Sequence, residues 1–270
     1  MNDPQSADPQ ISEPPTSDAR LIGRFGPVLA AALPPRDGSP HQEQVPVHAE
    51  ALHQLCLADG LLELLDWSRQ GVGADPLACM WLASLRWHRL VTGGFPEGAP
   101  EPPSRDLDAA LLDALRGHGL SIRRGTGAVS LAGLASGEMA YPSAPAQPEA
   151  DDAAALLRAV PVGMVPYIEE EMRRSWVRQA VSLTQGHPEL IAAAERLALL
   201  VRCAASGAAD ADPLQELEEI LQHAGADEEI AGTLRRQLRA CSPGSPDEAS
   251  APHQAVEALT REWEQVTRPA

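Results

Sequence analysis

Apolar residues recur along most of the chain with the spacing of one face of an α-helix. The clearest segment follows Pro188, and Gly207 provides a stop for it. Between these two residues the apolar positions form one continuous stripe, made by Leu190, Ile191, Ala194, Leu197, Ala198 and Val201. We therefore predict a helix between Pro188 and Gly207.

The same spacing predicts helices in most of the remaining sequence. Aspartates before proline, at Asp75-Pro76 and Asp212-Pro213, are typical helix starts. Other helices are expected at about 48–68, 107–115, 152–164, 169–183, 228–241 and 255–266. Strand signals are nearly absent, because no run of alternating β-branched and aromatic residues occurs. The pattern predicts an all-α protein.

The segments between these helices divide the chain into three parts. Residues 1–19 are rich in Pro, Ser, Asp and Gln, which predicts a disordered tail. We expect one helical domain over residues 20–241 and a linker with a C-terminal helix over 242–270. That last helix carries a short apolar stripe at Val256, Leu259, Trp263 and Val266. The stripe suits docking on the body of the protein or binding of a partner protein.

The net charge of the chain limits the kinds of molecule that it is expected to bind. The 270 residues include 21 basic and 38 acidic side chains, with a formal net charge of −17. Binding of nucleic acid or an anionic membrane needs clustered basic residues, so we expect neither. No apolar run reaches the roughly 18 residues that span a bilayer. The first residues lack the basic start and apolar run of a secretory signal, which indicates a cytoplasmic protein.

Several short segments, in their order along the chain, point to one protein family. They lie at residues 48–61, 74–76, 84–88, 124–131 (RGTGAVSL), 157–164 (LRAVPVGM) and 183–188 (LTQGHP). Together they resemble the motifs of the ADP-ribosylglycohydrolase family, over about residues 23–201. The resemblance implies a compact multi-helix all-α domain. It also implies a binuclear magnesium or manganese site that binds ADP-ribose and activates water against its glycosidic link to a protein side chain.

The metal-binding signatures of that family are altered in this sequence. The family's Thr-Asp-Asp-Thr corresponds to His48, Ala49, Glu50 and Ala51. Alanine cannot bind a metal, and imidazole is a poor ligand for magnesium. His48 and Glu50 are therefore only remnant metal-ligand candidates, and Glu50 is the weak catalytic candidate. The family's late Asp-x-Asp-Thr/Ser run has no counterpart in a usable place, so the resemblance implies a domain incomplete at its C-terminus.

Ligand-binding candidates come from two of the better-matching motifs. Gly125, Thr126 and Ser130 belong to the glycine-containing turn, and Arg158 belongs to the Arg-x-x-Pro-x-Gly segment. Each also has a structural alternative, because such residues start helices or form ion pairs. Asp151 and Asp152 would repel a diphosphate if they faced a pocket, whereas they would stabilise a helix if they capped its start.

Three hypotheses about function follow from these features. The first is a catalytically impaired relative that acts as a binding or regulatory module, with no cofactor, and that binds ADP-ribose or an ADP-ribosylated protein. The second is an active ADP-ribosyl hydrolase with a rearranged site that uses magnesium or manganese. The third is a decayed copy with no retained role.

Overall fold

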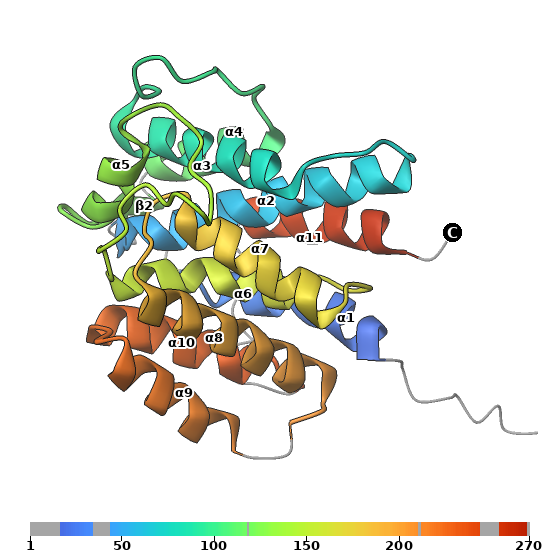
Figure 1. Cartoon of the computed structure of the whole chain (residues 1–270). Coiled ribbons are helices and arrows are strands. Elements are labelled where there is room, and N and C mark those ends of the chain that lie inside the picture. The colour runs from blue at the N-terminus through green and yellow to red at the C-terminus, as the bar shows by residue number, and fades with distance from the viewer. Residues whose placement is uncertain (1–16, 35–43, 118, 210–211, 244–253, 269–270) are drawn as a thin grey trace, which may run out of the picture.

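The computed structural model describes residues 17–34, 44–117, 119–209, 212–243 and 254–268. Helices make up most of this part, which confirms the all-α prediction (Figure 1). In chain order the helices are α1 (Ser17–Ala30), α2 (Ala49–Arg69), α3 (Pro76–Thr92), α4 (Asp106–Arg116), α5 (Ala128–Leu134), a short 3-10 helix η1 (Ala153–Arg158), α6 (Ala159–Gly163), α7 (Glu170–Ser182), α8 (Pro188–Ser206), α9 (Pro213–His223), α10 (Glu228–Ala240) and α11 (Gln254–Thr267). Two short strands, β1 (Val45–Val47) and β2 (Leu120–Ile122), pair in parallel.

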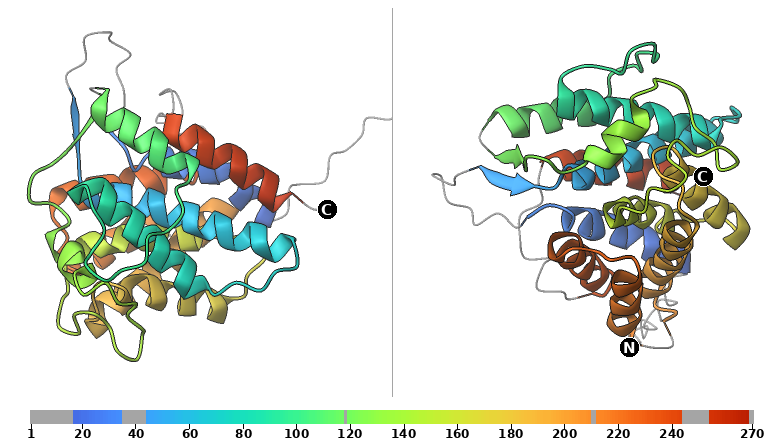
Figure 2. Two further views of the ribbon diagram at one scale, coloured as in Figure 1. Left: turned by 90° about the horizontal axis from the view of Figure 1, so that it is seen from above. Right: turned by 60° about the vertical axis from the view of Figure 1, so that its left-hand side comes forward.

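Helix α2 is the centre of the molecule. Every residue from Ala49 to Leu62 is buried. A helix that is covered on all sides must have neighbours in every direction. Figure 2 shows these neighbours: α3, α4 and α5 lie on one side of α2 and α11, and α1, α6 and α8–α10 lie on the other. The polar residues at the start of α2 are therefore held in the interior.

The predicted helix ends are formed by the predicted capping residues. The side chains of Asp75 and Asp212 accept hydrogen bonds from the amides of Leu77 and Leu214, at 3.0 Å each. Gly207 ends α8 with a φ of 74°. These contacts are local in sequence, which is why the sequence pattern could predict them.

The C-terminal helix packs on the body of the protein. The ring of Trp263 stacks on Phe25 of α1 with ring centroids 3.7 Å apart, and Val256 and Leu259 are also buried. A Cβ atom at Gly26 would lie only 2.7 Å from the hydroxyl oxygen of Thr260, so α1 and α11 are in close contact. Three residues of the α11 stripe, Val256, Leu259 and Trp263, are thus used for docking within the chain, whereas Val266 is half-buried.

Other details differ from the sequence-based expectations. Helix α1 was not predicted, since Gly23, Gly26 and Pro27 interrupt its pattern; it begins at Ser17, inside the expected tail, and residues 1–16 lie outside the described residues. The helix expected over 152–164 is instead η1 followed by the short α6, in which Pro161 lacks an amide hydrogen. Trp67, near the end of α2, is 42 % exposed. No helix in the described part of the chain has the length and apolarity to cross a membrane.

Candidate functional site

The glycine-containing turn packs directly on the start of α2. The amide of Ala49 donates to the Thr126 hydroxyl at 3.0 Å, and that hydroxyl donates to the carbonyl of Arg123 at 2.7 Å. Gly127 has a φ of 74°, and a Cβ atom there would lie 2.9 Å from the Cβ of Ala49. The hydroxyl of Thr126 is therefore engaged in capping α2. Gly125, with a φ of 86°, is exposed and has open space beside it.

His48 is the N-cap residue of α2. Its Nδ1 accepts a hydrogen bond from the amide of Glu50 at 3.1 Å, and its side chain is largely buried. An imidazole that accepts at Nδ1 carries its proton on Nε2 when it is neutral. The Nδ1 lone pair of His48 is thus committed to the helix start, although the sequence placed His48 among the remnant metal ligands.

Glu50 is fully buried and has two basic neighbours. Its Oε2 accepts a hydrogen bond from Nδ1 of His53 at 3.2 Å and lies 3.6 Å from Nε of Arg158. Burial by itself raises the pKa of the Glu50 carboxyl. The neighbouring His53 and Arg158, together with hydrogen bonds from His53 and Ser130, outweigh burial and lower this pKa to about 2. Glu50 is therefore a carboxylate at neutral pH.

His53 links Glu50 to α3. Its Nε2 lies 2.9 Å from the Ser84 hydroxyl, and its ring stacks on Trp87 with centroids 4.1 Å apart. Burial lowers the pKa of His53, so the ring is neutral at pH 7. Because a carboxylate only accepts, the proton on Nδ1 of His53 is donated to Glu50. The Ser84 hydroxyl also donates to the carbonyl of Met80 at 2.8 Å. The order acid, histidine, serine is that of a nucleophilic triad, yet Ser84 is fully buried and cannot reach a substrate.

Arg158 completes this buried cluster from the other side. Its Nη1 donates to the carbonyl of Ala180 at 2.8 Å, and its side chain is fully buried. Burial lowers the pKa of Arg158, although Glu50 opposes the shift. Ser130 lies next to Glu50, and its hydroxyl is 3.4 Å from that of Thr184. The structure thus brings three of the sequence candidates together: Glu50, Ser130 and Arg158.

Several buried polar atoms around this cluster have no hydrogen-bond partner in the described part of the protein. Such atoms are rare in folded proteins and point to bound water or ligand. They are Glu50 Oε1, both amide atoms of Gln54, Arg158 Nε and Nη2, Ser182 Oγ, and both amide atoms of Gln185. We call the residues Glu50, His53, Gln54, Ser130, Arg158, Ser182, Thr184 and Gln185 the polar centre. Sequence reasoning missed His53 and Gln54, although they lie one turn after Glu50 on the same helix.

The polar centre does not fit a pair of hard divalent cations. Such ions need several carboxylate oxygens. Ala49 and Ala51 supply none, and the carboxylate of Glu50 already contacts His53 and the cation of Arg158. Across the described residues, no group of three or more His, Cys, Asp or Glu side chains is placed to hold a metal ion.

One of the two aspartates that could have faced a diphosphate has a local role. Asp152 accepts a hydrogen bond from the amide of Ala154 at 3.1 Å and so caps η1. The structure therefore supports helix capping as the role of Asp152. A negative charge at a helix start is favourable, so Asp152 stabilises the segment that carries Arg158.

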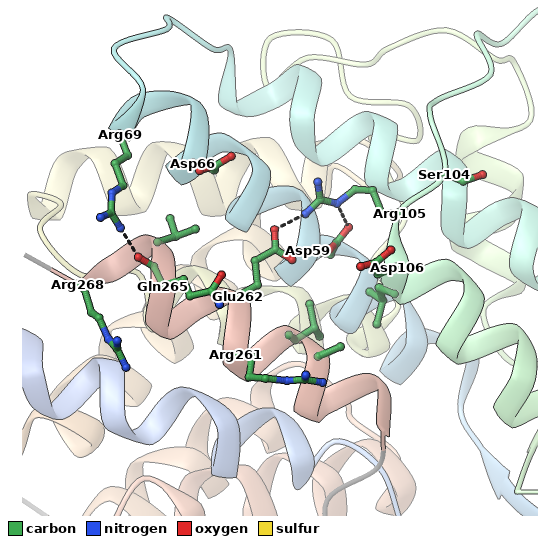
Figure 3. Close-up of a pocket in the computed structure, with 14 residues that line it drawn as sticks. Asp59, Asp66, Arg69, Ser104, Arg105, Asp106, Arg261, Glu262, Gln265 and Arg268 are labelled. Carbon is green, nitrogen blue, oxygen red and sulfur yellow. Dashed lines mark hydrogen bonds and ion pairs between the residues drawn. The ribbon is translucent and has the colours of Figure 1, made fainter. Parts of the chain in front are cut away.

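A second polar region lies at a cavity of about 890 Å³ between α2, α11 and the start of α4 (Figure 3). Arg105 bridges Asp59 at 2.6 Å and Glu262 at 2.7 Å, and Asp59 also pairs with Arg86 at 2.6 Å. Burial raises the pKa of Glu262 even though Arg105 lies beside it. These charges neutralise one another and tie α11 to α2. No residue of the polar centre lines this cavity.

Comparisons with known proteins place the chain in a family. The sequence model of the family described as ADP-ribosylglycohydrolase matches residues 9–267. One solved structure, an "ADP-ribosylglycohydrolase-related protein complex", is 19 % identical with a TM-score of 0.50, and the alignment covers 93 % of this chain and 99 % of that one. At this identity the structure supports the fold alone. Curated protein sequences give no match.

The family match extends well beyond the motifs that first suggested it. Those motifs lie within residues 23–201, whereas the match also includes the N-terminal helix α1 and the C-terminal helices α9, α10 and α11. The helices that follow the last motif are thus part of the matched region. This chain belongs to the ADP-ribosylglycohydrolase family.

Proposed function

We propose that this chain is a family member without hydrolase activity that acts as a binding or regulatory module. The observation that carries the proposal is the state of Glu50. This residue stands where the family has metal-binding aspartates, yet it is fully buried and contacts His53 and Arg158. A carboxylate neutralised in this way has little capacity left for a metal ion.

The acid–base properties of Glu50 support the same proposal. Hydrolysis needs a base that activates water, and an efficient general base has a pKa near the working pH. The pKa of Glu50 is lowered to about 2, so its carboxylate is a poor proton acceptor at neutral pH. His53 hydrogen-bonds Glu50 on one side and Ser84 on the other, so neither of its ring nitrogens faces solvent.

The proposed ligand of the module is ADP-ribose, either free or attached to a protein. The glycine-containing turn supports this part of the proposal, because exposed backbone at Gly125 lets a phosphate approach closely. Thr126 and Ser130 contribute by holding the turn on α2 and beside Glu50. Arg158 acts from the interior, where it keeps Glu50 ionised.

Two measurements test the absence of hydrolysis. Isothermal titration with Mn²⁺ and with Mg²⁺ is expected to show no stoichiometric binding. Incubation with a mono-ADP-ribosylated protein and either metal is expected to release no ADP-ribose, while an active family enzyme serves as positive control. Titration with two metal ions per chain, or metal-dependent release of ADP-ribose, would show that the site is active.

A separate titration with ADP-ribose tests the ligand. Gly125→Asp places a negative charge on the turn and is expected to weaken binding at least about tenfold, as like charges do at short range. Gly98→Asp is the matched control, since Gly98 also has a positive φ, of 78°, and open space beside it. If ADP-ribose does not bind the unmodified chain, or if both variants bind equally, the ligand assignment is wrong.

A further inference from the structure

One side chain of the loop between α5 and η1 ties this loop to two neighbouring elements. We call residues 137–150 the strap; they connect α5 to η1. The side-chain amide of Gln147 donates to the carbonyl of Val129 at 2.8 Å and to the carbonyl of Thr184 at 2.7 Å. Gln147 therefore joins α5 to the turn between α7 and α8, and Thr184 in that turn belongs to the polar centre.

Backbone contacts place the strap directly on this turn. The amide of Ala146 donates to the carbonyl of Ser182, and the amide of His187 donates to the carbonyl of Ala150, both at 3.2 Å. A Cβ atom at Gly186 would lie 2.3 Å from Cγ of Pro145. Nothing larger than glycine fits there, so the strap seals one side of the polar centre.

The middle of the strap, residues 141–144, is exposed, although Gly137 at its start packs closely on the backbone of Glu97 and Ala99. Tyr141 is 47 % exposed, and within the strap Tyr141 and Ala144 exchange two backbone hydrogen bonds. A cavity of about 400 Å³ lies between the strap and α5, with Gly133, Met139 and Tyr141 among its lining residues. A segment with an exposed outer face and incomplete packing beneath it can open at low cost in free energy.

The residues beneath the strap favour its opening. Ser182 and Gln185 are buried, and their side-chain polar atoms have no partner in the described part of the chain. Buried polar atoms without partners are costly, and water relieves that cost when it reaches them. Closure thus forms the two hydrogen bonds of Gln147 while it keeps Ser182 and Gln185 from water.

We propose that the strap is a gate that lifts from the turn at residues 182–187 as a local unit and admits water and small polar molecules to the polar centre. Gln147 is the latch of this gate. The inference concerns access to the polar centre and goes beyond the proposed function, which assigns ADP-ribose to the exposed turn at Gly125.

Thiol labelling tests the gate in the absence of any ligand. Ser182→Cys places a thiol under the strap, and iodoacetamide modification is followed for each cysteine by peptide mass mapping. Adding Gln147→Ala removes two hydrogen bonds and is expected to speed labelling at position 182 by about tenfold or more. Adding Gln222→Ala, whose side chain is exposed on α9, is the matched control and is expected to change nothing.

Cys56, buried in α2 away from the strap, reports global unfolding in the same samples. If position 182 reacts in step with Cys56, or no faster with Gln147→Ala, the strap does not open locally and the proposal fails. If Ser182→Cys does not fold, hydrogen exchange of the unmodified chain decides instead. The amides of Ala146 and His187 are expected to exchange faster than those of α2, and equal protection would overturn the gate. Neither result depends on whether ADP-ribose binds.

Discussion

Glu50 and Arg158 form a buried ion pair in which each charge compensates the other. Both side chains are fully buried, and the closest contact between their charged groups is 3.6 Å. Removing one partner of such a pair leaves an uncompensated charge in a medium of low polarity. The main role of Arg158 in the structure is therefore to balance the negative charge of Glu50 in the interior.

Glu50→Gln is expected to lower the free energy of unfolding by about 3–5 kcal/mol, because it leaves the charge of Arg158 unpaired. Urea denaturation at pH 7 measures the change. Glu149→Gln, at an exposed position in the strap, is the control and is expected to change stability by less than about 0.5 kcal/mol. Equal stability of the two variants would show that the ion pair has no structural role.

The same residues make stability depend on pH. Burial lowers the pKa of His53 below 6.5, so the unfolded chain binds more protons than the folded one as the pH falls through 6.5. Stability is expected to be complete above pH 6.5 and to decrease below it. The lowered pKa of Glu50 adds a second loss as the pH falls from 4.5 towards about 2.

Urea denaturation at pH 7.5, 6.0 and 5.0 checks this dependence. His53→Gln removes the first titrating group and is expected to flatten the profile between pH 7.5 and 5.0, whatever its effect on absolute stability. His223→Gln on α9, remote from the polar centre, should keep the slope of the unmodified chain. A profile that stays steep in His53→Gln would assign the dependence to other groups.

At the scale of elements, the contact between α2 and α5 depends on a glycine. Gly127 begins α5 in a left-handed conformation, and its missing Cβ makes room for Ala49 and Trp87. The ring nitrogen of Trp87 in turn donates to the carbonyl of Ala49 at 2.8 Å. Three helices therefore meet at the start of α2, and the side chain of Glu50 follows directly after this junction.

Gly127→Ala is expected to destabilise the protein several times more than Gly71→Ala. The two glycines have nearly the same φ, 74° and 73°, so the strain of a left-handed alanine is shared. Only Gly127 adds a steric overlap, since a Cβ atom at Gly71 meets nothing within 4 Å. Thermal denaturation of both variants measures how much the steric overlap adds to the backbone strain. Similar melting temperatures would mean that the residues around Gly127 move to accommodate the added methyl group.

At the scale of the whole molecule, the two ends of the described chain share one core. The stack of Phe25 on Trp263 joins α1 to α11, and Arg105 joins α11 to α2 through Glu262 and Asp59. Since these contacts link residues that are far apart in sequence, the described helices are expected to unfold as one unit. This behaviour would distinguish a maintained fold from a decayed copy.

Trp263→Ala is expected to cost about 3–5 kcal/mol, as for other large buried aromatic residues. Trp67→Ala is the control, because Trp67 is 42 % exposed and is expected to cost much less. Differential scanning calorimetry is expected to show one sharp transition in the unmodified chain and the same single transition, at lower temperature, in Trp263→Ala. A separate early transition would mean that α11 unfolds independently.

Structural features that depend on contacts between neighbouring residues could be predicted from the sequence alone. Helix starts at Asp75 and Asp212 and the stop at Gly207 use contacts between residues only a few positions apart, so their patterns are visible in the sequence. The family resemblance also came from local motifs in a fixed order. The departure of residues 48–51 from the family's Thr-Asp-Asp-Thr pattern was likewise apparent from the sequence.

The contacts of Glu50 with Arg158 and of His53 with Ser84 could not be predicted from local patterns, because they join residues far apart in the sequence. The link from His53 to Ser84 spans 31 positions, and the pairing of Glu50 with Arg158 spans more than a hundred. No periodicity reports such pairs, because packing between helices sets which polar groups meet. The docking of α11 on α1 and the position of the strap also depend on packing between residues far apart in the sequence. Helix propensities and helix caps, by contrast, act within a single turn.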